Sequence, residues 1–145
     1  MAEVPDRGRP RSLVIYADAA VRGSPGEAGI GVVLCGEDGD ALQEFGRFIG
    51  PATAQVAAYT AVGEALRAAL ALGATELRVL VGSDALAREV GGLAEVRKSA
   101  LRPLLVEVRR LLLRFRRWTI DSVPSEALSR TAELANMSID RQRNK

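Results

Sequence analysis

The stretch IYADAAVRGSPGEAGIGVVL, residues 15–34, decides the fold because it places a turn between two strand-like segments. Residues 12–18 are apolar and β-branched, which predicts a first strand that is buried on both faces. The cluster RGSPG at 22–26 predicts the turn, and IGVVLC at 30–35 predicts the second strand. An Asp-Gly turn signal follows, so residues 41–49 should return antiparallel as a third strand.

Helical and extended segments alternate over the rest of the chain. Apolar spacing and turn residues predict six further elements: a helix over 53–72, a strand over 76–81, a short helix after Asp84, an amphipathic helix over 100–115, a strand over 118–123 and a helix over 125–137. The order βββαβααβα predicts an α/β fold. We expect one domain over residues 12–137, with a flexible N-terminal arm over 1–11 and a polar C-terminal tail over 138–145.

The composition excludes several classes of function. The 145 residues include no histidine, which excludes Ser-His and Cys-His nucleophile pairs and leaves carboxylates as the main catalytic groups. The single cysteine, Cys35, cannot form an internal disulfide, which indicates a reducing, cytoplasmic compartment. No apolar run approaches the roughly 20 residues of a membrane span, and residues 1–11 have no apolar signal core. We therefore expect no membrane partner.

One segment carries the basic character of the chain. Between residues 97 and 117, eight basic residues accompany one acidic residue, which gives +7 in a chain whose net charge is +2. This density favours a surface for a polyanion, most naturally the phosphates of nucleic acid. The alternative interpretation is the solvated face of an amphipathic helix. The eight residues are Arg97, Lys98, Arg102, Arg109, Arg110, Arg114, Arg116 and Arg117.

Four blocks of sequence, in the same order, resemble the ribonuclease H domains of type 1. They are the opening stretch at 15–34, AQVAAYTAVGEALRAALALGA at 54–74, LVGSDALAREV at 80–90 and VPSEALSRTAELAN at 123–136. In the family these blocks form the first hairpin, the central helix, the strand that ends in the motif SD, and the closing helix. The resemblance spans almost the whole chain, and it implies a ribonuclease H-like fold: a five-stranded mixed sheet of order 3-2-1-4-5 with helices on both faces.

The same resemblance implies a reduced catalytic site. Family members hold two magnesium ions with four carboxylates, and here Asp18 and Asp84 match two of those four positions. Ala58 and Ala132 stand at the other two. Two carboxylates imply at most weak magnesium binding and no required cofactor. Outside the resemblance, Asp84 also fits the N-cap of the following helix. Glu133 is the candidate substitute acid, although successive helix residues are turned by about 100°.

Residues that read nucleic acid in the family also differ. Ser24 stands at the Asn of the family's GNPG motif, and Ala54 and Gln55 stand at the paired Asn that contact the backbone and 2′-hydroxyls of a hybrid. We keep Ser24 and Gln55, with the eight basic residues, as candidate nucleic-acid contacts.

Three functional hypotheses follow from these observations. The first is a catalytically inactive ribonuclease H homologue that binds nucleic acid, an RNA/DNA hybrid or another duplex, through the basic segment. The second is a magnesium- or manganese-dependent ribonuclease with a rearranged site that uses Glu133 beside Asp18 and Asp84. The third is a protein-interaction scaffold, including a homodimer formed through a sheet edge or the Leu-rich helix at 100–115.

Overall fold

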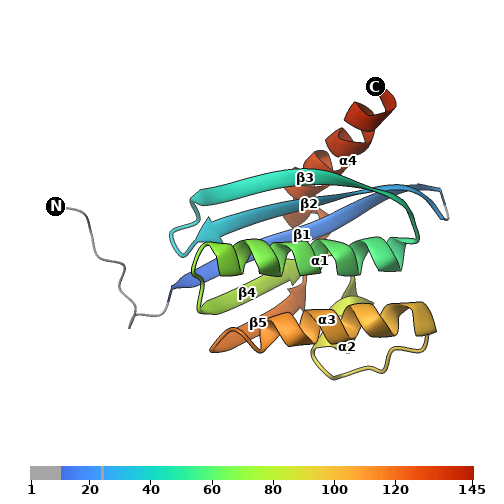
Figure 1. Cartoon of the computed structure of the whole chain (residues 1–145). Coiled ribbons are helices and arrows are strands. Elements are labelled where there is room, and N and C mark those ends of the chain that lie inside the picture. Colours follow the sequence, from blue (N-terminus) through green and yellow to red (C-terminus); the bar gives the residue numbers. More distant parts are fainter. Residues whose placement is uncertain (1–10, 24) are drawn as a thin grey trace.

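The computed structural model describes residues 11–23 and 25–145. Over these residues, five strands form one mixed sheet in the order β3-β2-β1-β4-β5 (Figure 1). The strands are β1 (Ser12–Gly23), β2 (Gly26–Gly36), β3 (Ala41–Ala52), β4 (Glu76–Val81) and β5 (Arg117–Ser122). The first three pair antiparallel, and β4 pairs parallel with both β1 and β5. The fold class and the strand order predicted from the sequence are confirmed.

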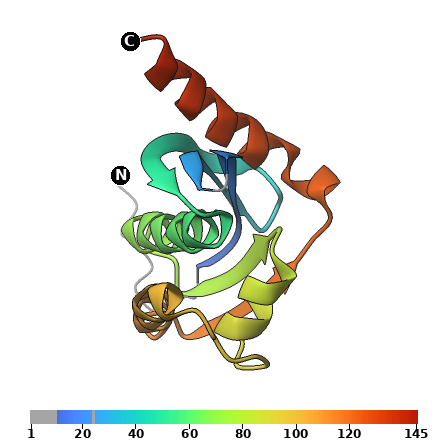
Figure 2. The same cartoon turned by 90° about the vertical axis from the view of Figure 1, so that its right-hand side faces the viewer.

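Helices cover both faces of the sheet (Figure 2). They are α1 (Ala54–Ala71), α2 (Asp84–Val90), α3 (Arg102–Leu112) and α4 (Ser129–Arg143), with short 3₁₀ turns at Ser99–Leu101 and Ser125–Leu128. Apolar side chains of α1, α2 and α3 form the main core against one face of the sheet. On the opposite face, Leu134 of α4 packs against Val33 and Cys35 of β2. The domain therefore has three layers, and the sheet is the middle one.

Glycines let α4 approach the sheet at backbone contact. A Cβ atom on Gly31 would overlap the carbonyl oxygen of Thr131, and one on Gly46 would overlap that of Leu134. Both glycines lie on strands beneath α4, so the backbone of the helix rests directly on β2 and β3. This close approach fixes where the first turns of α4 lie relative to β1.

Several element boundaries differ from the prediction. Strand β1 continues to Gly23 because it pairs with β2 along its whole length, and its residues Val14 and Tyr16 are only half-buried because α4 covers part of that face. The expected polar tail at 138–145 is corrected: α4 runs to Arg143, and Ile139 is fully buried.

The predicted N-terminal arm lies mostly outside the described residues, which begin at Arg11. Arg11 itself is attached to the domain, because its N–H donates to Thr75 Oγ1 over 2.7 Å and its carbonyl accepts from the Thr75 N–H. Within the described chain, no helix combines the length and the apolar content that a bilayer span needs.

Candidate functional site

Asp18 lies on the central strand β1, beside the end of the parallel strand β4. The last pair of that ladder is Ala17 with Val81, so the residues that follow each of them are neighbours. Burial of the half-exposed side chain raises the pKa of the Asp18 carboxyl, and a hydrogen bond from the Ala19 N–H, 2.9 Å from Oδ1, lowers it by a smaller amount. Asp18 is thus a partly desolvated carboxylate in the middle of β1, beside the C-terminal end of β4.

Gly82, and not Asp84, holds the position next to Asp18. A Cβ atom on Gly82 would lie 3.5 Å from Asp18 Oδ1, which is ordinary van der Waals contact. Asp84 lies two residues further on, in the first turn of α2, where its exposed Oδ1 accepts a hydrogen bond from Ser122 Oγ at 3.2 Å. The N-cap of α2 is Ser83. The motif SD at 83–84 therefore lies beyond the end of β4, which is Val81, and not at the end of the strand as the resemblance implies.

The other predicted site residues on the helices do not supply a second carboxylate. Ala58 lies on α1 and Ala132 on α4, and both are half-buried. The exposed side chain of Glu133 forms an ion pair of 2.7 Å with Arg130, which is also paired with Glu44 on β3. The candidate substitute acid is therefore part of a surface charge network over β3.

A hollow of about 460 Å³ opens at Asp18, and we call it the Asp18 hollow. It is lined by Asp18, Ala19, Val21, Gly23, Ala54, Ala58, Gly82, Ser83, Val123, Ser125 and Leu128. Among these described lining residues, Asp18 is the only ionisable one. Nowhere in the described chain do three or more His, Cys, Asp or Glu side chains gather into a metal-binding group. Magnesium needs near-octahedral oxygen coordination, so this site does not fit the two magnesium ions that the family holds.

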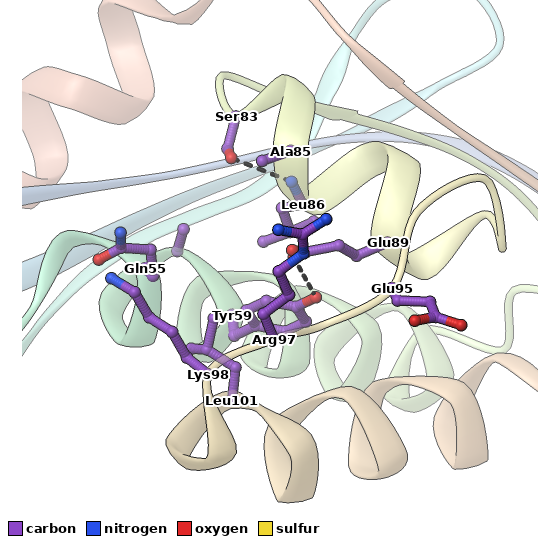
Figure 3. Close-up of a pocket in the computed structure, with 11 residues that line it drawn as sticks. Gln55, Tyr59, Ser83, Ala85, Leu86, Glu89, Glu95, Arg97, Lys98 and Leu101 are labelled. Atoms are coloured by element: carbon purple, nitrogen blue, oxygen red, sulfur yellow. Dashed lines mark hydrogen bonds between the residues drawn. The ribbon is translucent and has the colours of Figure 1, made fainter.

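A second hollow, of about 320 Å³, adjoins the first and shares Ala58 and Ser83 with it. We call it the Tyr59 hollow (Figure 3). The buried Tyr59 hydroxyl donates to Glu89 Oε1 over 2.8 Å, and burial together with this interaction raises the pKa of Tyr59. In Figure 3, Lys98 extends toward Gln55 at the beginning of α1. The Tyr59 hollow thus has an aromatic, apolar floor and a polar rim.

The structure divides the eight basic residues into two groups. Arg97 and Lys98 line the Tyr59 hollow, and Arg102 and Arg109 line a third hollow at the loop between α2 and α3. The second and third hollows share Glu95, so they adjoin each other. We call these four cations the basic groove.

The other four basic residues lie elsewhere. Arg114, Arg116 and Arg117 follow the C-terminal end of α3, at the opposite end of that helix from Arg102. An eleven-residue helix is roughly 16 Å long. Arg110 pairs with Glu107 one turn earlier, at 3.6 Å. Four of the eight basic residues therefore line the basic groove and four do not, although Arg109 and Arg110 both lie in the last turn of α3.

A family model described as reverse transcriptase-like matches residues 16–138. The chain belongs to this ribonuclease H-like family. It is 36% identical over 136 residues to a ribonuclease HI of Halobacterium salinarum, a match that covers 94% of this chain and 67% of that protein. It also spans 35% of the length of a bifunctional protein of Mycobacterium tuberculosis at 36% identity, with 88% of this chain covered.

Solved ribonuclease H structures superpose on almost the whole domain. The N-terminal ribonuclease H domain of a Mycobacterium tuberculosis protein gives a TM-score of 0.88 at 35% identity, covering 92% of this chain and 97% of that one. A ribonuclease H1 named LC11, solved in complex with an RNA/DNA hybrid, gives 0.86 at 32% identity, covering 90% and 98%.

Two contacts of this ribonuclease H-like domain had no signal in the sequence. Tyr59 and Glu89 are 30 residues apart, and Arg109, a further 20 residues on, donates from Nη2 to the Glu89 carbonyl over 3.0 Å. Only the packing of α1, α2 and α3 brings them together. Gln55 is exposed and lines the Tyr59 hollow, whereas Ser24 lies outside the described residues.

Proposed function

We propose that this domain binds nucleic acid through the basic groove and does not cleave RNA by two-metal catalysis. The observation that carries the proposal is the arrangement of four cations in two adjoining hollows, next to a hollow that has a single carboxylate. The related LC11 ribonuclease H1, solved with an RNA/DNA hybrid, supports nucleic acid as the ligand class.

The loss of cleavage follows from the residues around Asp18. By resemblance and by register, the four carboxylate positions of the family correspond here to Asp18, Ala58, Gly82 and Ala132. Two-metal catalysis stabilises both the attacking and the leaving oxygen, and each ion must be held by protein ligands. Asp18 alone holds at most one magnesium ion weakly, so no cofactor is required for the proposed function.

Sequence and backbone discrimination should be weak. Basic side chains contact phosphates, which position a protein on a duplex and carry no sequence information. Ala54 has no amide with which to contact a 2′-hydroxyl, and Gln55 provides only one. We infer that RNA/DNA hybrid, duplex RNA and duplex DNA bind with similar affinity.

A paired cleavage and binding assay tests the proposal. The purified chain is incubated with an RNA/DNA hybrid and magnesium or manganese, and binding to the same hybrid is measured by fluorescence anisotropy. We expect binding without cleavage above background. Metal-dependent cleavage that disappears in Asp18→Asn would instead establish the rearranged-ribonuclease hypothesis. Absence of binding even at low salt would favour the interaction scaffold, for which the exposed Val106 of α3 and Leu113, directly after α3, offer apolar contacts.

Restoration of the carboxylates tests the assignment of Gly82. The variant Ala58→Glu/Ala132→Asp keeps Asp84, and the triple variant adds Gly82→Asp. If Gly82 holds the family position, magnesium should raise the melting temperature of the triple variant more than that of the double variant, because only the triple variant surrounds Asp18 with three further carboxylates. Equal changes in melting temperature for the two variants would indicate that Asp84, and not Gly82, holds the family's carboxylate position.

The cellular compartment also belongs to the proposal. We place the domain in the reducing cytoplasm, which the single and buried Cys35 supports.

A further inference from the structure

The Asp18 hollow combines one carboxylate with walls that are mostly apolar. Ala19, Val21, Ala54, Ala58, Val123 and Leu128 supply hydrocarbon, and Ser83 and Ser125 supply hydroxyl groups. Its volume of about 460 Å³ lies within the roughly 300–1,000 Å³ that small-molecule sites occupy. The hollow therefore has the size and the amphipathic lining of a ligand site.

The charge of Asp18 has no cationic partner within the described chain. None of the ion pairs among the described residues includes it, and its one hydrogen bond there is the Ala19 N–H on Oδ1. Arg97 and Lys98 line the adjoining Tyr59 hollow and not the Asp18 hollow. A partly buried carboxylate without a partner is costly, and a bound cation would offset that cost.

We propose that the Asp18 hollow binds an organic cation, a primary ammonium or guanidinium group carried on an aliphatic stem. The N–H donors of such a group would bind the Asp18 carboxylate, and the stem would pack against Ala58, Val123 and Leu128. A magnesium ion differs because it needs several further oxygen ligands, whereas one carboxylate is enough for a charge-assisted hydrogen bond to an N–H group. The inference goes beyond nucleic-acid binding and does not depend on it.

Titration with small cations, followed by ¹⁵N–¹H nuclear magnetic resonance, tests the proposal. The probes are n-butylammonium and n-butylguanidinium, with n-butanol as the uncharged analogue and magnesium chloride as a separate arm. We expect both cations to shift the amide signals of Ala19 and Gly82 in a saturable manner, and n-butanol to shift them much less. A basic peptide and a polyamine, added later, would show which natural source of the cation binds more tightly.

Matched variants assign the binding to one carboxylate. Asp18→Asn keeps the shape of the side chain and removes the charge, so it should weaken the affinity for both cations by at least about tenfold. Asp121→Asn makes the same change at an exposed position on β5 and should leave the affinity unchanged. Equal affinity in Asp18→Asn, equal binding of n-butanol, or magnesium binding at Ala19 and Gly82 in preference to the organic cations would each overturn the proposal.

Discussion

The proposal that the basic groove holds the phosphates predicts how nucleic-acid binding depends on salt. The perturbation is the double variant Arg97→Ala/Lys98→Ala, which removes the two cations that line the Tyr59 hollow. The matched control is Arg114→Ala/Arg116→Ala, which removes the same charge at the opposite end of α3. If the basic groove holds the phosphates, only the first variant should change the binding.

The structure sets the magnitude. The logarithm of the binding constant falls by about 0.9 per tenfold rise in salt for each phosphate neutralised on a duplex. Four groove cations therefore predict a slope of about −3.6, so binding should weaken roughly 150-fold between about 50 and 200 mM salt. The double variant should have a slope of about −1.8, with a loss of roughly 12-fold over the same range.

Fluorescence anisotropy of a short labelled RNA/DNA hybrid, titrated at several potassium chloride concentrations, measures these slopes. A slope near −7 that becomes shallower in both variants would show that the whole basic segment contacts phosphate, and it would refute the proposal that only the basic groove does. A slope that becomes shallower only in Arg114→Ala/Arg116→Ala would show that the phosphates contact the residues after the C-terminal end of α3 and not the basic groove. Circular dichroism of both variants checks that the fold is retained.

Three further predictions concern stability. Asp18→Asn should raise the urea midpoint at neutral pH: burial raises the folded-state pKa of this acid, so its ionised form disfavours folding above that pKa, and the gain should vanish when the pH falls below the usual Asp range. Gly31→Ala should lower the free energy of unfolding by about 1–3 kcal/mol in denaturant titrations, because the new methyl group overlaps the Thr131 carbonyl. A variant as stable as the wild-type protein would refute the close packing of α4 on β2. Tyr59→Phe should cost about 1–2 kcal/mol in the same measurement through the lost hydrogen bond to Glu89, and a neutral result would show that water replaces it.

The fold could be predicted because local patterns and one long resemblance agree. The β-branched run at the start of β1, the Asp-Gly turn before β3 and the Ala-rich α1 each determine their own element from a few neighbouring residues. The end of α4 could not be predicted in this way. Its last residues are polar in sequence, and only the packing of Ile139 against the sheet shows that the helix continues.

The site could be predicted only in part, because its geometry depends on register and on helix direction. The position of Asp18 next to the end of β4 was predicted correctly, but Asp18 lies in the middle of β1 and not at its end, because β1 continues to Gly23. The choice between Gly82 and Asp84 depends on where the parallel ladder stops, which no spacing of residues along the chain reveals. In the same way, Arg102 begins α3 whereas Arg114 follows its C-terminal end, a separation that the linear charge density does not show.

The electrostatics around Asp18 differ from those of the four-carboxylate site that the family resemblance implies. Several carboxylates in one cleft repel each other unless a cation is bound, so their mutual repulsion adds to the burial penalty of each. With Ala58 and Gly82 beside Asp18, that repulsion is absent, and the remaining cost is the desolvation of one charge. A single, partly desolvated carboxylate favours any ligand that brings one positive charge and tolerates apolar walls. The adjoining basic groove, for which we propose phosphate binding, is lined by four cations and by two acidic residues, Glu89 and Glu95. Because the Asp18 hollow and the Tyr59 hollow share Ala58 and Ser83, the proposed organic-cation site and the proposed phosphate site adjoin each other.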